Sequence, residues 1–468
     1  MMRQYHIKRL KRVFPIVVLI FILAITAFQV PVVREFFIGA SGVEANIFVD
    51  LSGTLGHMPQ PWKNLAQGGE DHAWTVAQVQ NEVQHLQPEY IRIDHLYDFY
   101  DPVTIVNGQP VYSWEKADAA VQAILATGAK PYLSLSYTPT PLIQTDIVGE
   151  PSDYSMYQRI IRDTILHYSK TLAIEDVIYE MWNEPDLFGG WKVYGPKNYL
   201  KLYEYAGRGA LEARTENALP FTFGGPAITA LYKNWVDALV KKSIEQNLPL
   251  DFISWHRYTT DVDQYEKDAR DVREWLDAYP QLLNVELHIT EWGHDSNNQA
   301  GYDTQYGAAH TVLGGLAMIG KVDRGFVFEI QDGKDPAGNA KWGRWGLLTH
   351  SSGGAEKKPR YNAILELNQL EGEWLPVAGN GSWVKAGASQ VGAEYRILLA
   401  NFDEAGTHRE TVPLTLTNIP AQTLRVRQKS ISGIVQESEV ATTEADIRLE
   451  IPMEPLSVVM VTITEIVE

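Results

Sequence analysis

From residue 47 to about residue 370, short apolar runs alternate with longer segments in which apolar residues recur every three or four positions. The short runs have the length and the β-branched and aromatic content of buried strands, and the longer segments have the period of a helix. The predicted strands are 51–57, 90–94, 130–136, 177–182, 221–225, 252–256, 286–290 and 325–328. The predicted helices are 74–86, 114–127, 154–172, 196–214, 233–246 and 302–319.

This repeated order of strand and helix predicts an α/β fold, a (β/α)8 TIM barrel, over residues 47–370. A doubly wound open sheet is the alternative architecture. It is disfavoured because no glycine-rich phosphate loop opens any of the predicted helices.

After residue 371 the helical period gives way to short alternating runs separated by Gly, Pro, Asn and Asp. Such a pattern predicts an antiparallel β-sandwich over residues 371–468. The segment has no carboxylate-rich or aromatic cluster of its own, so we expect a structural support rather than a binding module. The predicted strands are 395–400, 411–416, 424–428, 447–451 and 457–462.

The beginning of the chain has the pattern of a membrane anchor. A basic segment, residues 1–12, precedes an apolar run over residues 13–33. The run has roughly the 20 residues that span a bilayer, and the basic flank should stay in the cytoplasm. A signal peptide cleaved near residues 43–45, giving a secreted protein, is the alternative, but that site lies well beyond the apolar run. We therefore expect an uncleaved transmembrane signal anchor at 13–33, a linker at 34–46, and an extracytoplasmic remainder at the cell surface.

Composition narrows the possible partners. The net charge of −18 disfavours nucleic acid and anionic lipid surfaces as partners, but it does not disfavour uncharged sugars. The chain has no cysteine, which excludes disulfides, thiolate metal sites and cysteine nucleophiles. No spacing of His, Asp and Glu resembles a set of metal ligands, so we expect neither a metal nor another cofactor. The pattern predicts no particular oligomeric state.

Two of the predicted strands end in a glutamate. Strand 177–182 runs into Asn183-Glu184-Pro185, and the proline must stop the strand because it cannot donate to a sheet ladder. Strand 286–290 is followed directly by Glu291. Counted along the chain these are the fourth and seventh strands, whose carboxyl ends face each other across the mouth of a closed barrel. Two carboxyl groups that flank one bond are what glycoside hydrolysis requires, although either glutamate alone could be an ordinary loop residue.

The chain resembles glycoside hydrolase family 39. The resemblance rests on residues 182–185, 252–258 and 287–292, and on residues 345–348 and 358–363 after the eighth strand. This family of β-xylosidases, α-L-iduronidases and some bacterial exopolysaccharide hydrolases belongs to the larger clan of retaining (β/α)8 glycosidases. The resemblance covers about residues 51–370 and implies hydrolysis of a cell-surface or extracellular oligo- or polysaccharide. A barrel that binds carbohydrate or acts as a scaffold without turnover is an alternative, and inverting hydrolysis is another.

The resemblance also implies roles for individual residues. Glu184 would be the general acid/base and Glu291 the nucleophile, in a double displacement. Asn183 would hydrogen-bond the sugar 2-hydroxyl, or else cap a turn. Arg92 is a charge in an apolar strand. It resembles the clan's second-strand arginine, which holds the nucleophile ionised; a buried ion pair with Asp94 is the alternative.

Further residues near the predicted mouth are candidates for substrate contact. Tyr258 could donate to Glu291, and His256 could contact the sugar or simply lie at the rim. Trp182 and Trp292 could stack on a sugar ring or fill the rim of the barrel.

The chain departs from the family at the eighth strand. Where the family usually has a tryptophan, the sequence continues Phe328-Glu329. Glu329 is an additional carboxylate that could bind sugar hydroxyls or pair with an arginine. The floor of the sugar site could then be built by Trp342 or Trp345. This leaves open the sugar, the linkage and its anomeric configuration, and whether cleavage is internal or terminal.

Overall fold

A computed structural model of the chain describes residues 42–68, 76–334, 337, 339, 341, 344–419, 423–431, 433–441 and 446–465. The expected basic segment 1–12 and anchor 13–33 lie outside these residues, as does Trp342. Of the helices within the described part of the chain, none combines the length and the hydropathy that a bilayer crossing requires. The anchor at 13–33 therefore stays a prediction.

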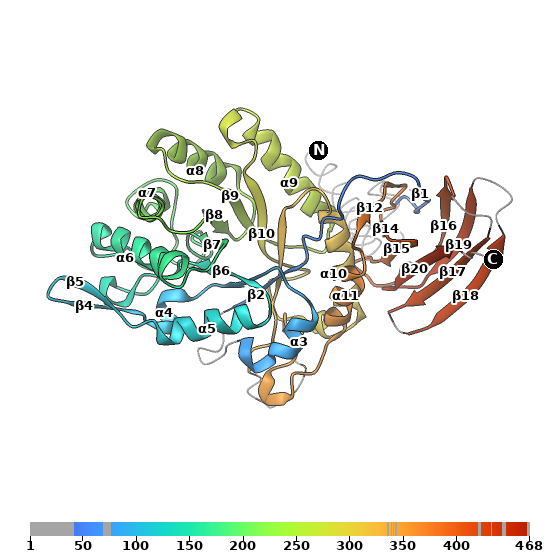
Figure 1. Cartoon of the computed structure of the whole chain (residues 1–468), viewed down its shortest axis with the longest axis horizontal. Coiled ribbons are helices and arrows are strands. Elements are labelled where there is room, and N and C mark those ends of the chain that lie inside the picture. Colours follow the sequence, from blue (N-terminus) through green and yellow to red (C-terminus); the bar gives the residue numbers. More distant parts are fainter. Residues whose placement is uncertain are drawn as a thin grey trace, which may run out of the picture.

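Eight of the described strands form a closed barrel in the order β10-β11-β2-β3-β6-β7-β8-β9 (Figure 1). Every neighbouring pair is parallel. The TIM barrel is thereby confirmed, and the doubly wound sheet is excluded. The strands are β2 (Asn64–Gln67), β3 (Tyr90–Ile93), β6 (Lys130–Ser134), β7 (Val177–Glu180), β8 (Phe221–Ile228), β9 (Phe252–Tyr258), β10 (Glu286–Gly293) and β11 (Arg324–Phe328).

Helices surround the barrel, and all six predicted ones are present to within a few residues. The α-helices are α3 (Gln80–His85), α4 (Leu96–Tyr100), α5 (Glu115–Ala126), α6 (Tyr154–Leu166), α7 (Tyr199–Thr215), α8 (Lys233–Gln246), α9 (Asp263–Leu276), α10 (Gln305–Met318) and α11 (Pro359–Asn368). Short 3-10 or π segments are η1 (Val76–Val79), η2 (Thr140–Leu142), η3 (His167–Thr171), η4 (Pro280–Leu282), η5 (Ala300–Asp303) and η6 (Ser351–Gly353). A hairpin of β4 (Val103–Val106) and β5 (Gln109–Tyr112) projects from the barrel at the left of Figure 1.

The first barrel strand is not where the apolar pattern predicted it. Residues 51–57 form no strand, and β2 (Asn64–Gln67) takes the first position. Residues 47–50, placed in the predicted barrel, form β1 (Ile47–Asp50), which pairs with β13 and β16 in the sandwich. In β1 the first and third residues are buried and the second is exposed. That alternation is typical of a sheet with one solvated face, whereas barrel strands are buried on both faces.

Two packed sheets form the predicted C-terminal sandwich. One has the order β13-β1-β16-β19 and the other β12-β14-β15-β20-β17-β18. The pairs are antiparallel, except that β1 and β16 are parallel. The remaining strands are β12 (Glu373–Trp374), β13 (Val377–Ala378), β14 (Val384–Val391), β15 (Glu394–Asn401), β16 (Glu410–Thr417), β17 (Thr423–Ser430), β18 (Val435–Ala441), β19 (Ile447–Met453) and β20 (Val458–Glu465).

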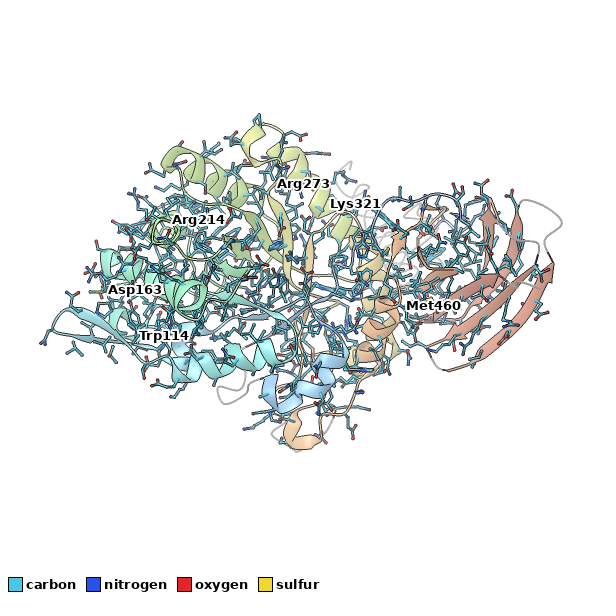
Figure 2. All side chains as sticks on the ribbon, viewed as in Figure 1. Trp114, Asp163, Arg214, Arg273, Lys321 and Met460 are labelled. Atoms are coloured by element: carbon cyan, nitrogen blue, oxygen red, sulfur yellow. The ribbon has the colours of Figure 1, made fainter. Side chains whose placement is uncertain are left out.

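The six-stranded sheet is buried on both faces where it meets the barrel. Ile397 and Val461 belong to the sandwich core, whereas Leu398 and Met460 belong to the barrel core. Figure 2 shows Met460 where the sandwich adjoins α10 and α11. Helix α10 lies between barrel and sandwich, which explains why almost every one of its side chains is buried. The two units therefore share apolar packing.

Candidate active site

Glu184 lies in the loop after β7, where Pro185 follows the strand. The backbones of Trp182 and Glu184 have φ angles of +74° and +44°. Such positive angles are uncommon for residues other than glycine, and they occur disproportionately at functional sites. The Glu184 amide donates to the Ala227 carbonyl oxygen at 2.9 Å, which fixes the turn against β8. Glu184 is thereby held at the carboxyl end of the barrel.

Glu291 lies near the carboxyl end of β10, at a break in strand register. Ile289 pairs with Trp255, but the next residue of β9, His256, pairs with Glu291 rather than with Thr290. An extra residue of this kind is a β-bulge, which bends a strand and changes the direction of its side chains. The bulge allows Glu291 to point into the mouth of the barrel.

The two glutamates converge on one cavity of about 750 Å³, which both of them line. One carboxylate oxygen of Glu184, one carboxylate oxygen of Glu291 and one ring nitrogen of His256 all lie within 4.8 Å of one another. The Glu184 side chain is 14% exposed and that of Glu291 is 8% exposed. The predicted pair of carboxyl groups is therefore present, in a largely buried setting that retains access through the cavity.

His256 lies between the two carboxyl groups. Its Nδ1 is 2.8 Å from Oε1 of Glu184 and 3.5 Å from Oε2 of Glu291. Burial lowers the pKa of His256, but Glu291 and Glu184 outweigh burial, so the pKa lies above its ordinary value. A proton on Nδ1 is thus favoured, and it is donated to Glu184. The polar contacts of His256 Nδ1 are with the two glutamates, so direct contact with a sugar stays a prediction.

Arg92 connects three polar groups at the floor of the mouth. It donates from Nε to Glu180 at 2.7 Å, from Nη2 to Asn183 at 2.7 Å and from Nη1 to Glu291 at 3.1 Å. These contacts agree with the role implied for the second-strand arginine, rather than with a simple pair with Asp94. Sequence reasoning missed Glu180, although a carboxylate in an apolar strand four residues before Glu184 was a detectable signal.

Both carboxylate oxygens of Glu291 accept hydrogen bonds from neighbouring side chains. Arg92 donates to Oε1, and the hydroxyl of Tyr258 donates to Oε2 at 2.9 Å. Burial nevertheless raises the pKa of Glu291 to about 7; His256 and Arg92 oppose this rise and Glu184 adds to it. Arg92 does lower this pKa, as expected, but the loss of hydration outweighs the nearby positive charges, so the pKa of Glu291 still lies above its ordinary value.

Asn183 lines the cavity with its amide held on both sides. Its Oδ1 accepts from Arg92, and its Nδ2 donates to the hydroxyl of Tyr137 at 3.3 Å. The side chain is thus engaged with other side chains instead of capping a turn. Its hydrogen bond to a sugar hydroxyl stays a prediction.

Trp182 and Trp292 are fully buried. Trp182 packs edge-on against Trp191, with 5.4 Å between ring centroids, and Trp292 packs against Tyr265 at 5.7 Å. Each is the direct neighbour in sequence of a residue that lines the cavity, but neither tryptophan lines the cavity itself. The stacking interpretation is therefore wrong for both, and they fill the space behind the mouth.

Glu329 does not reach the cavity either. It is fully buried and accepts from Nε2 of Gln67 at 2.9 Å. Burial and the neighbouring Asp332 raise its pKa well above the ordinary value. Neither sugar binding nor an arginine pair is its role in this structure. Instead, Trp345 lines the cavity together with Phe328, with 5.6 Å between their ring centroids.

Several residues of the cavity were not predicted. Asp94 and His95 follow β3, and the His95 ring stacks on Phe99 with 4.2 Å between centroids. Leu187 and Phe188 follow Glu184 in the same loop. The sequence signal for these residues was their position directly after predicted strands, but such positions are common to every loop at this end of a barrel.

Glu184, His256 and Glu291 could together offer ligands to a metal ion. Their chemistry fits a cation poorly, because His256 would have to give up the proton that it shares with the carboxylates. The expectation of no metal and no cofactor stays a prediction.

Comparisons with known proteins concern the family of the chain. The sequence model of the glycosyl hydrolases family 39 matches residues 54–376. A beta-xylosidase of Geobacillus stearothermophilus is 29% identical over 163 residues, which are 32% of each chain. A beta-xylosidase of Caldicellulosiruptor saccharolyticus is 26% identical over 302 residues, 57% of this chain and 58% of the relative. The chain thus spans 32% of the length of the first relative and 58% of the length of the second.

Solved structures share the whole architecture. A monomeric beta-xylosidase from Caulobacter crescentus CB15 superposes with a TM-score of 0.74 at 20% identity, over 90% of this chain and 100% of that chain. The GH39 enzyme from Xanthomonas axonopodis pv. citri gives 0.73 at 18% identity, over 92% and 99%. At such identities the likeness concerns the fold. The family model, however, covers well over half of the sequence. We conclude that this chain belongs to the glycosyl hydrolases family 39.

Proposed function

We propose that the protein is a retaining glycoside hydrolase that acts through Glu184 and Glu291. The observation that carries this proposal is the convergence of the two side chains in one cavity, with oxygens no more than 4.8 Å apart. Retaining enzymes have carboxyl groups about 5–5.5 Å apart, whereas inverting enzymes need about 6.5–9.5 Å to admit a water molecule. The short separation therefore favours retention.

In the first step Glu291 attacks the anomeric carbon, and the bond to the leaving oxygen breaks. Glu184 gives its proton to that oxygen, so the leaving group departs as an alcohol and the sugar becomes an ester of Glu291. Arg92 and Tyr258 hold the attacking carboxylate in place through its two oxygens. In the second step the Glu184 carboxylate takes a proton from water, the water oxygen bonds to the anomeric carbon, and Glu291 is released.

His256 supports the exchange of roles. Before attack, its proton on Nδ1 compensates the negative charge that the two glutamates share. Once Glu291 is esterified its charge is lost, and the Glu184 carboxylate is left beside the His256 proton. Glu184 can then act as a base towards water.

The test is hydrolysis of a panel of aryl glycosides, with aryl β-xylosides first because the two relatives are named beta-xylosidases. We expect wild type to release the chromophore, Glu291→Gln to lose nearly all turnover, and NMR to show that the first product keeps the anomeric configuration of the substrate. An inverted first product would exclude the double displacement. Ligand binding without any release across the panel would favour a carbohydrate-binding protein.

We also propose that the protein acts outside the cytoplasm, anchored by residues 13–33, on a glycoside at the cell surface or in the extracellular space. The support is the apolar run behind a basic flank. The test is expression of the full chain in bacterial cells, followed by fractionation and external protease treatment. We expect membrane-bound protein that the protease digests from outside. After deletion of residues 1–33, the protein should no longer be found in the membrane fraction. Full-length protein in the soluble cytoplasmic fraction would contradict the proposal.

A further inference from the structure

One wall of the active-site cavity is apolar although it is open to solvent. Ile147, Val148, Leu187 and Phe188 line the cavity, and we call these four residues the leaving-group wall. Ile147, Leu187 and Phe188 are 41%, 60% and 42% exposed. Single exposed apolar residues are common, but a contiguous set in a binding cavity indicates a surface that an apolar partner covers.

Backbone contacts hold the two loops in a conformation that exposes these apolar side chains. The amides of Leu187 and Phe188 both donate to the Glu184 carbonyl oxygen, at 3.0 and 2.7 Å, which forms one helical turn after the glutamate. Gly189, with φ of +96°, brings this turn against the neighbouring loop: a Cβ there would lie 2.4 Å from the Val148 carbonyl oxygen. The two loops therefore form one continuous wall whose apolar side chains are held outward.

The position of the wall decides which part of a substrate it meets. Phe188 lies four residues after Glu184, its amide donates to the Glu184 carbonyl oxygen, and both side chains line the same cavity. A general acid must reach the leaving oxygen, and the leaving group therefore extends over the residues that surround the acid. The wall consequently lies beside the leaving group rather than beside the sugar that is attacked.

Apart from the aromatic pair Phe328 and Trp345, other parts of the cavity carry polar side chains. Arg257, Ser296 and Asn297 line it on the side of β9 and β10, and Asn183 and Asp94 line it near the floor. These side chains can hydrogen-bond sugar hydroxyls, whereas the four residues of the leaving-group wall offer no side-chain donor or acceptor.

Near the wall, the hydroxyl of Thr229 is a donor that also lines the cavity. It donates to the Asp186 carboxylate. Its proton is therefore already engaged, which leaves the acid side of the cavity poorly suited to a hydroxyl-rich leaving group.

We propose that the enzyme cleaves glycosides whose leaving group is apolar, an alkyl or aryl aglycone, and that Leu187 and Phe188 determine this specificity. The inference rests on the proposed function. It narrows the substrate from carbohydrate in general to a sugar attached to a hydrocarbon or aromatic group. An extended sugar chain on the acid side is the competing occupant.

The experiment uses the sugar that the aryl glycoside panel identifies, and compares its methyl, butyl and octyl glycosides with its disaccharide and trisaccharide. Simple alkyl alcohols have similar acidity, so the chemistry is the same along the series and only contact with the wall changes. We expect kcat/KM to rise with chain length, by up to about fourfold for each methylene that the wall covers. The octyl glycoside should be preferred over the disaccharide.

Matched variants assign the effect to the wall. Leu187→Ser and Phe188→Ser should each reduce the increase of kcat/KM with chain length. Leu187→Met, which keeps an apolar side chain at this position, should retain the increase. Leu283→Ser is the control, because Leu283 is also exposed, at 56%, but lies before β10 at the opposite end of the barrel. Circular dichroism checks that each variant is folded.

The outcomes separate the two proposals. If no glycoside of the panel is hydrolysed, the proposed function fails and the inference fails with it. If glycosides are hydrolysed but kcat/KM does not depend on alkyl length, or sugar leaving groups are preferred, only the apolar leaving group is refuted. If both serine variants keep the wild-type dependence, Leu187 and Phe188 are not its cause, and the specificity proposal is overturned.

Discussion

Glu184 and Glu291, the proposed acid/base and nucleophile, have different surroundings. Glu291 receives hydrogen bonds on both oxygens from Arg92 and Tyr258, which favour the ionised form needed for attack. Glu184 is largely buried, faces the cavity and has His256 as its close partner. The geometry thus suits Glu184 to deliver a proton to a group in the cavity and Glu291 to attack.

The role of Glu184 can be tested with the acidity of the leaving group. We expect Glu184→Gln to reduce kcat/KM by about 10²–10⁴-fold for alkyl glycosides, because these leave only when protonated. For dinitrophenyl glycosides the loss in the first step should be much smaller, since that group leaves as an anion. Glu245→Gln, on the exposed face of α8, is the control. Equal losses for both substrates would mean that Glu184 is not the acid.

The pH dependence follows from Glu291. Its pKa is raised to about 7, and it must be ionised to attack, so kcat/KM should fall as the pH decreases through about 7. Tyr258→Phe removes a hydrogen bond that stabilises the ionised form, which raises the pKa further. We expect the acidic limb of the profile to move up by about one pH unit. The control is Tyr232→Phe at an exposed position. A limb that moves to lower pH would contradict the assignment.

Glu180 acts through Arg92. Both side chains are fully buried and joined at 2.7 Å. Glu180→Gln would leave the arginine charge with one carboxylate partner fewer, so the free energy of unfolding should fall by about 3 kcal/mol. Urea unfolding measures this loss. A variant as stable as wild type would show that Glu291 and Asn183 alone suffice to compensate the buried guanidinium.

At the scale of elements, periodicity predicted most of the fold and proline predicted where β7 ends. Periodicity failed at β2, because four residues are too few to show a period. It also could not reveal the bulge in β10, since a register shift depends on pairing with β9 and β11. The two glutamates were predictable from strand ends, but the burial of Trp182 and Trp292 depends on neighbours distant in sequence.

Helix α10 makes this dependence on neighbours testable. A Cβ at Gly314 would lie 2.8 Å from the Trp292 ring, directly behind Glu291. We expect Gly314→Val to overpack this contact, to lower the free energy of unfolding by about 1–3 kcal/mol and to reduce kcat by displacing Glu291. Thermal unfolding and steady-state kinetics measure the two effects. Unchanged stability would mean that α10 can move away from β10 without cost.

At the scale of the whole molecule, β1 and the two-faced strands β15 and β20 join barrel and sandwich into one unit. Strand β1 precedes the barrel in sequence but is completed by β13 and β16 after it. Leu398 faces the barrel core, while its neighbour Leu399 faces the sandwich core. Each unit therefore buries part of its apolar surface against the other, and the sandwich supports the barrel.

This shared core predicts cooperative unfolding. Leu398→Ala removes buried side-chain atoms from the contact and should lower the free energy of unfolding by about 2–5 kcal/mol. Ile434→Ala, at a side chain that is 65% exposed, should change it little. In calorimetry, barrel and sandwich should unfold together in wild type, and Leu398→Ala should shift the whole transition. Two separate transitions, of which Leu398→Ala shifts only the one that belongs to the sandwich, would contradict this prediction. The sandwich would then fold independently, and the contact would not stabilise the barrel.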